Sequence, residues 1–126
     1  MSAESGASGP LKAVEFLADS RDTLSKFPDA ARADTGFALY RVQIGKMPRR
    51  YSPRTNVGAG ALAIKVDNEA GTFRTIYVAK FPEAVYVLHA FQKKSRKGDE
   101  DPKEHVEIAK RRYQELLRER RKRGLR

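Results

Sequence analysis

The chain has 126 residues, which is the size of a single domain. Its 26 Lys and Arg residues against 16 Asp and Glu give a formal charge of +10, and this balance favours a polyanionic partner such as nucleic acid. There is no cysteine and there are only two histidines, which excludes disulfides and argues against a closed zinc site or another metal cofactor. Because no apolar stretch is long enough for a membrane span or a signal peptide, we expect a cytoplasmic protein.

The N-terminal part predicts a strand followed by two helices. Apolar and β-branched residues over 11–17 indicate the strand. Ser20 is placed to cap a short helix that runs to about Lys26 and is ended by Pro28. A second helix is expected to stop at Gly45. The residues expected on its buried face recur at helical spacing; they are Ala33, Phe37, Tyr40 and Ile44.

The middle of the chain predicts a basic loop and then an antiparallel meander. Residues 46–60 contain Pro, Gly and basic residues but no acid, so the loop's charge is expected to be unpaired locally. Three of its residues are candidate RNA contacts: Arg49, Arg50 and Arg54. Strands are expected over 61–66, 72–79 and 84–92, because turn-forming residues separate these runs.

The C-terminal part predicts a helix with a well-marked start. Asp101 is placed as its cap, Pro102 at its first position and Glu104 as the partner in a capping box. Its apolar stripe consists of Val106, Ala109, Tyr113 and Leu116. Three regions are therefore expected: a disordered tail over 1–10, a folded domain over 11–117, and a frayed or disordered basic extension over 118–126.

The last two predicted strands bring two candidate functional residues together. A four-residue turn over 80–83 places Arg74 opposite His89, with Ile76 opposite Val87 and Val78 opposite Val85. Arginine neutralises a phosphate and histidine moves protons near neutral pH, so this pair suits catalysis on RNA. The structural alternative, which residue types alone favour, is that Arg74 extends to the sheet edge and His89 is a core residue.

Further basic residues are candidates for catalysis or RNA binding. Lys65 is a candidate general base, although strict alternation places it on the opposite face of the sheet from Arg74. After the last strand comes a basic run suited to an RNA backbone: Lys93, Lys94, Arg96 and Lys97. In isolation, this run favours an ordinary solvated loop over an RNA-binding one.

Several of these segments together resemble a known family. The run Tyr86-Val-Leu-His-Ala-Phe-Gln-Lys-Lys-Ser95, followed by a charged helix with Ile108-Ala-Lys-Arg-Arg112, resembles the C-terminal half of phage-derived Gp49-like toxins. These toxins form a HigB-like branch of the RelE/ParE superfamily. Upstream, Ala63-Ile-Lys-Val66 and Thr72-Phe-Arg-Thr-Ile-Tyr-Val78 look like the family's paired strands. The resemblance extends over residues 11–117.

The resemblance implies a fold, an activity and partners. The fold is the RelE-like α+β fold, in which an antiparallel sheet carries an N-terminal helical hairpin and a C-terminal helix. The activity is ribosome-dependent mRNA cleavage without metal or cofactor, within a toxin–antitoxin pair whose antitoxin has a helix-turn-helix domain. Arg74 matches the phosphate-stabilising residue, Lys65 the base near the 2′-hydroxyl and Lys94 the basic residue after the last strand, whereas a catalytic role for His89 stays open. A gyrase-poisoning toxin and an inactive phage remnant that binds nucleic acid are the alternatives.

Overall fold

The computed structural model describes residues 11–94, 98 and 100–126; the predicted tail over 1–10 lies outside the described residues. The elements follow in the order β1 (Ala13–Phe16), α1 (Ser20–Ser25), α2 (Asp29–Gln43), β2 (Tyr51–Pro53), β3 (Ala61–Asn68), β4 (Gly71–Val78), β5 (Ala84–Lys93) and α3 (Lys103–Lys122). The α+β class, the helical hairpin after the first strand, the meander and the C-terminal helix are confirmed. None of the helices in the described part of the chain is both long and apolar enough to span a membrane.

The strands form a five-stranded sheet in the order β1-β5-β4-β3-β2. β3, β4 and β5 form the predicted antiparallel meander. β2 was not predicted: it lies within the stretch 46–60 expected to be a loop, and it pairs antiparallel with β3. The first strand differs, because β1 pairs parallel with β5. A parallel pair needs a long connection, and here the two helices and the meander supply it. The sheet is therefore mostly, not entirely, antiparallel.

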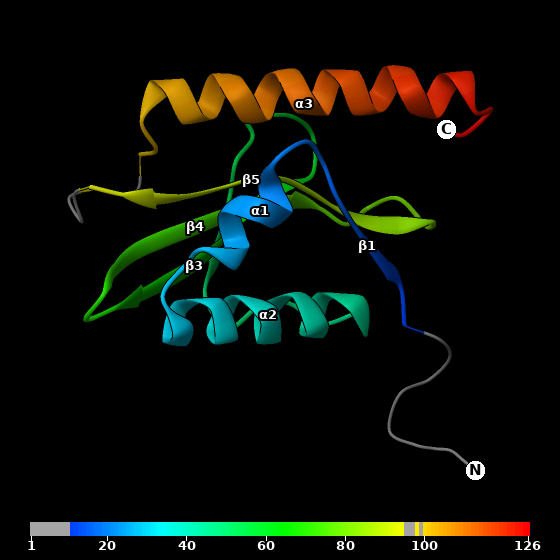
Figure 1. The fold of residues 1–126 in the computed structure, drawn as a ribbon. Coiled ribbons are helices and arrows are strands. Elements are labelled where there is room, and N and C mark those ends of the chain that lie inside the picture. Colours follow the sequence, from blue (N-terminus) through cyan, green and yellow to red (C-terminus); the bar gives the residue numbers. More distant parts are fainter. Residues whose placement is uncertain (1–10, 95–97, 99) are drawn as a thin grey trace, which may run out of the picture.

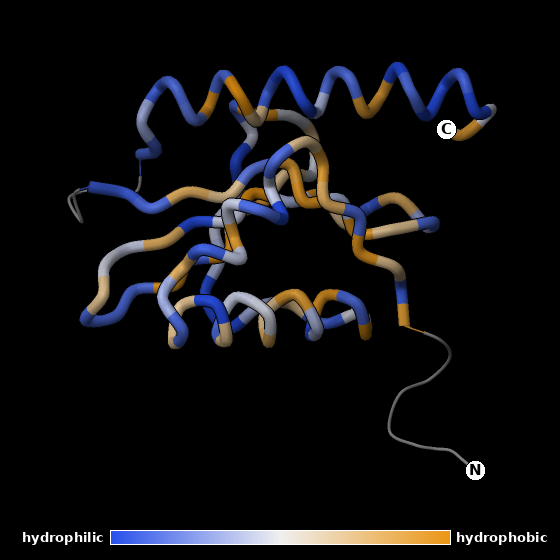
Figure 2. The backbone as a smooth tube through the Cα atoms, viewed as in Figure 1, coloured by the Kyte–Doolittle hydropathy of each residue, from blue (hydrophilic) through white to orange (hydrophobic). Residues whose placement is uncertain are grey.

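Helices cover both faces of the sheet (Figure 1). On one face α2 packs over a core that includes Leu39, Val42, Ile64, Phe73 and Tyr77. On the other face α3 packs over a second core that includes Ile76, Leu88 and Phe91. Figure 2 shows that α3 is hydrophilic over most of its length, with apolar residues only at intervals. The predicted stripe supplies them: Ala109, Tyr113 and Leu116 are buried, and Val106 packs against the same core.

The buried face of α2 is not the one that the helical spacing predicts. Phe37 and Tyr40 are 49% and 44% exposed. The buried residues are Ala31, Thr35, Ala38, Leu39 and Val42. These are mostly smaller side chains, which allow the helix axis to approach the sheet closely. The large aromatic residues produce a more conspicuous apolar pattern, but they lie on the solvent side.

Both predicted side-chain caps are wrong. Ser20 is the first residue of α1, and its hydroxyl donates a hydrogen bond of 3.3 Å to the carbonyl oxygen of Val87 in β5. At α3 the cap position is Pro102, which provides no side-chain cap, and Asp101 binds Arg54 instead. Both polar side chains therefore join distant segments and do not close the helix ends.

Residues 118–122 are not a frayed extension, because α3 continues to Lys122. Arg120 is only 3% exposed, and its Nε and Nη2 donate to the Glu83 carboxylate at 2.6 and 3.1 Å. Its guanidinium also lies 3.8 Å from the centre of the Phe81 ring. The hydrogen bond from Arg120 is the main cause that lowers the pKa of Glu83 to about 2. The charged end of α3 is thus attached to the β4–β5 turn.

Candidate active site

Lys65 and Arg74 lie on the same face of the sheet, contrary to the sequence prediction. They are directly paired across β3 and β4. The connection between these strands is shorter than expected, because Asn68 already pairs with Gly71. Relative to the longer turn that the sequence predicts, this tight turn shifts the partner of every β3 residue by one position in β4. Because neighbouring residues of a strand face opposite sides of the sheet, the shift places Lys65 and Arg74 on the same face. Gly71 suits the turn, since its φ of 142° is rarely adopted by other residues.

The register between β4 and β5 also differs from the prediction. Arg74 lies opposite Phe91, and Ile76 lies opposite His89. A β-bulge after Ile76 then shifts the register, so that Tyr77 pairs with Val87. The register already differs by one position at the turn, where Val78 pairs with Tyr86 and not with Val85. The bulge adds a second shift, which the length of the turn alone could not reveal. Arg74 and His89 share the face covered by α3, but they are not direct neighbours.

Arg74 is held inside the sheet surface and does not extend to its edge. Its side chain is 4% exposed, and Nη1 donates to the Asp67 carboxylate at 2.9 Å. Arg50 donates to the other oxygen of Asp67 at 3.0 Å. Burial opposes ionisation of Asp67, but the hydrogen bonds from the two arginines outweigh it and lower its pKa. Nε of Arg74 is buried and has no hydrogen-bond partner among the described residues.

His89 is part of a hydrogen-bonded cluster with residues of α3. It is 6% exposed, its Nε2 lies 2.8 Å from Nδ1 of His105, and Nη1 of Arg112 lies 3.2 Å from its Nδ1. Burial, then the Arg112 and His105 charges, lower the pKa of His89 to about 4. The His105 ring stacks on Phe91 with centroids 4.0 Å apart and planes at 7°. In the described segments no three potential metal-ligating side chains gather.

The remaining predicted basic residues fall into different environments. Arg49 is exposed, and its guanidinium lies 5.5 Å from the centre of the Phe37 ring. Lys93 is buried, with Nζ 3.4 Å from the carbonyl oxygen of Gly98, whereas Lys94 is exposed. Arg96 and Lys97 lie outside the described residues.

Arg54 does not belong to an exposed basic surface. Its side chain is 6% exposed and forms an ion pair with the fully buried Asp101, at 2.6 Å from Nε and 3.3 Å from Nη2. The charges of Arg54 and Arg50 are therefore paired in the fold, although, as expected, no acid within the loop pairs with them. Both acidic partners come from other parts of the sequence, where inspection of the loop alone could not find them.

A family model describes much of this architecture: phage derived protein Gp49-like matches residues 22–114. The chain belongs to the Gp49-like family. This family is part of the RelE/ParE-like toxin group, in agreement with the resemblance of the strands and of α3. No curated protein matches the chain significantly. The matched segment contains the Lys65–Arg74 pair, His89, His105 and Arg112.

In this Gp49-like protein, the α3 face combines two kinds of group at one end of the sheet. Lys65 and Arg74 supply neighbouring positive charges, and Phe91, the cross-strand partner of Arg74, stacks on the His105 ring. His105 was not among the predicted site residues. It lies sixteen positions from His89, so only the packing of α3 on β5 brings the two rings together. Such an arrangement suits an anion that is bound and oriented without a metal.

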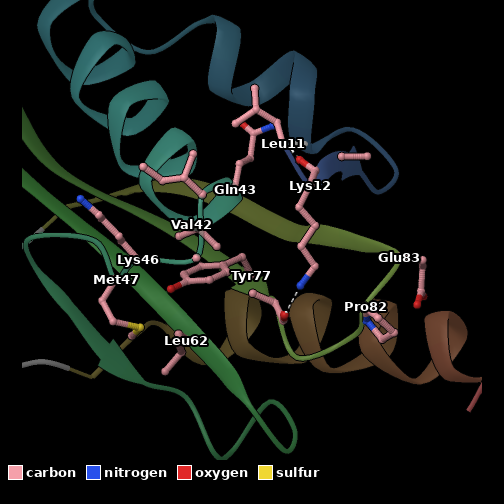
Figure 3. A pocket seen from close by; sticks show the side chains of 14 residues that line it. Leu11, Lys12, Val42, Gln43, Lys46, Met47, Leu62, Tyr77, Pro82 and Glu83 are labelled. Atoms are coloured by element: carbon pink, nitrogen blue, oxygen red, sulfur yellow. Dashed lines mark hydrogen bonds between the residues drawn. The ribbon is translucent and has the colours of Figure 1, made fainter. Parts of the chain in front are cut away.

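A separate cavity of about 790 Å³ lies on the face of the sheet that α2 covers (Figure 3). Its walls come from the segment before β1, the end of α2 and the β4–β5 turn. There Lys12 donates a hydrogen bond of 2.6 Å to the carbonyl oxygen of Ala79. Burial raises the pKa of Tyr77, which also lines the cavity, to about 12. Because Tyr77 packs in the α2 core, this cavity is distinct from the candidate active site.

Proposed function

We propose that this protein is a toxin that stops translation by cutting mRNA on the ribosome. The observation that carries the proposal is the direct pairing of Lys65 with Arg74 on one face of the sheet, in a member of a RelE/ParE-like family. RNA contains its own nucleophile, the 2′-hydroxyl group. A protein that cuts it by in-line attack needs to orient the phosphate, neutralise its growing charge and manage two protons.

Each basic residue has a defined part in this proposal. Arg74 stabilises the scissile phosphate, which its planar guanidinium suits because it can donate two parallel hydrogen bonds. Asp67 holds that guanidinium and must share it with the phosphate. Lys65 lies beside the attacking 2′-hydroxyl, and the exposed Lys94 binds the RNA backbone at the end of β5.

We propose that His89 is not a general base but a positioning residue, which holds residues of α3 against the sheet. Its pKa of about 4 leaves the ring neutral at pH 7, and both ring nitrogens already face hydrogen-bond partners. A general base needs a free lone pair within reach of the proton that it removes. His89 instead connects the sheet to Arg112 and His105 of α3.

The charge distribution supports binding to the ribosome. Residues 93–126 contain 14 basic and 7 acidic residues, so the excess charge is concentrated at this end of the chain. Ribosomal RNA offers a dense array of phosphates, and contacts with them release counterions. The same surface suits an acidic partner protein.

Primer extension on a reporter mRNA after brief induction tests the proposal. Wild-type protein should produce new cleavage ends only while the message is translated. Arg74→Lys should lose these ends although it keeps the charge, because lysine lacks the two-pronged geometry. Lys65→Ala and Lys94→Ala should each reduce cleavage by roughly ten- to ten-thousand-fold. Lys26→Ala is the matched control, because Lys26 directly follows α1, its side chain is 75% exposed, and its ion pair with Asp22 lies at the protein surface.

The outcome also separates the alternatives. Growth arrest with intact messages and damaged DNA would replace the ribonuclease proposal with gyrase poisoning. A wild-type protein that neither arrests growth nor cuts messages would indicate an inactive nucleic-acid-binding remnant. Melting temperatures of all variants show whether a loss of cleavage reflects a loss of folding.

We also propose that a neighbouring gene encodes an antitoxin with a helix-turn-helix DNA-binding domain. A strongly basic toxin offers a complementary surface to an acidic partner segment. Co-expression of the adjacent reading frame should restore growth, and the two proteins should purify together. If the chain is harmless alone and the adjacent product does not bind it, the proposal of a toxin–antitoxin pair is wrong.

A further inference from the structure

The hydrogen bonds around His89 determine where its proton lies. Arginine can only donate, so Nδ1 of His89 accepts from Arg112 and carries no proton. Nε2 of His89 therefore holds the proton of the neutral ring and donates it to Nδ1 of His105, 2.8 Å away. Nδ1 of His105 is then also an acceptor. The remaining nitrogen of His105, Nε2, must carry the proton of its ring.

Arg112 is held in place by further hydrogen bonds, so it continues to donate to His89, and His89 continues to donate to His105. Its Nη2 donates to Asp19 at 2.8 Å, and its Nη1 also donates to the carbonyl oxygen of Leu88 at 3.0 Å. If His105 were protonated, its Nδ1–H would face the Nε2–H of His89, and two donors would meet. The cluster therefore keeps both rings neutral.

The charged groups around His105 do not reverse this conclusion. Asp101 and Glu104 favour the charged form of His105, but burial outweighs them and lowers its pKa. Asp101 is itself neutralised by Arg54. On the side of His89, the positive Arg112 opposes a second positive charge and Asp19 acts in the other direction.

His105 lies beside the proposed phosphate site with one donor available. Its ring stacks on Phe91, which is the cross-strand partner of Arg74. It is only half-buried, and its Nε2 has no hydrogen-bond partner among the residues that the structure describes. We propose that His105 contacts the RNA, donating its fixed Nε2–H to a non-bridging oxygen of the phosphate held by Arg74. The proton stays on the histidine throughout, and the inference rests on the proposed ribonuclease function.

Three substitutions of His105 test whether the donor at Nε2 matters. The side-chain nitrogen of Gln is as many bonds from Cα as Nε2 of histidine, whereas that of Asn corresponds to Nδ1. His105→Gln should therefore keep cleavage within about threefold of wild type. His105→Asn and His105→Phe should each lose about 10- to 100-fold, the effect of one hydrogen bond to a charged oxygen. Melting temperatures identify variants whose loss follows from unfolding.

Two outcomes of the cleavage assay would overturn the inference. If His105→Phe cuts as well as wild type, the ring serves only to attach α3 to the sheet. If folded His105→Gln is as inactive as His105→Phe, the histidine transfers a proton and is not a fixed donor. Failure of the proposed function looks different, because the wild-type protein itself would then not cut translated messages.

Imidazole nitrogen NMR of the free wild-type protein gives an answer that does not depend on cleavage. Long-range proton–nitrogen spectra at pH 7 should show both His89 and His105 as neutral rings protonated at Nε2. A His105 ring that is charged, or protonated at Nδ1, would refute the inference. Arg112→Met should release the constraint, and His89 should then populate the other tautomer.

Discussion

Arg54 distinguishes a folding role from an RNA-binding role for the basic loop. Arg54→Met keeps most of the apolar stem but removes the guanidinium from the buried carboxylate of Asp101. It also removes the hydrogen bonds from Nη1 to the Ser52 hydroxyl at 2.6 Å and to the carbonyl oxygen of Pro53 at 3.0 Å. Because Asp101 would remain as an uncompensated buried charge, we expect a loss of about 3–5 kcal/mol in the free energy of unfolding.

Urea unfolding followed by circular dichroism measures this loss directly. For a domain of this size the melting temperature should also fall by roughly 10–20 °C. The double variant Arg54→Met/Asp101→Leu should recover part of the stability, since no unpaired charge is then left in the interior. Arg49→Met is the matched control, because Arg49 is exposed and its removal should change stability by about 0.5 kcal/mol or less.

Ribosome binding measured across a salt series tests the RNA-binding role, as the unfolding assay tests the folding role. A phosphate contact contributes about 0.7 to 0.9 to the slope of log affinity against log salt. We expect Arg49→Met to flatten this slope and a folded Arg54→Met protein to leave it unchanged. If Arg54→Met flattens the slope and leaves the unfolding curve unaltered, the structural assignment of Arg54 is wrong.

Three further predictions concern packing, the C-terminus and pH. Gly58→Ala places a Cβ atom 2.5 Å from the Tyr113 ring, so urea unfolding should show a loss of about 1–3 kcal/mol, and an unchanged midpoint would contradict this close packing. Deleting residues 118–126 removes the buried Arg120 and should lower the melting temperature by several degrees in a thermal scan; no change would mean that the end of α3 adds nothing to the fold. His89 has a folded-state pKa of about 4 against 6.5 unfolded, so the unfolded chain binds more protons between these values. Stability should therefore fall by up to about 3 kcal/mol as the pH is lowered through this window, and urea unfolding of His89→Phe should lack that part of the pH dependence.

The sequence predicted the elements well because their signals are local. The apolar stripe of α3 and the glycine that ends α2 each depend on residues within a few positions of one another. Registers depend on the exact length of a turn, and a single residue changes the result. The tight turn before Gly71 brought Lys65 to the side of Arg74. A one-position shift at the β4–β5 turn and the bulge after Ile76 together moved His89 two positions away from Arg74.

The errors at polar residues share a different cause. Ser20 and Asp101 stand where caps are common, and Arg54 stands among other basic residues, so their local contexts favour ordinary interpretations. Each instead binds a group that is far away in the sequence: Arg54 and Asp101 are separated by 47 positions. Nothing in a single sequence identifies such partners before the sheet is assembled. His105 was overlooked as a site residue for the same reason.

The charge pairs along α3 explain how a mostly hydrophilic helix holds a precise position. Its apolar contacts stabilise the helix against the sheet, but apolar attraction is not directional and tolerates small rotations and shifts. Three arginine–carboxylate pairs add direction: Arg54 with Asp101 just before the helix, Arg112 with Asp19 at its middle and Arg120 with Glu83 near its end. A shift of α3 along its axis would break all three pairs together. Since His105 lies in the first turn of this helix, the same pairs determine where its ring meets Phe91, and thus where the proposed donor faces the phosphate site.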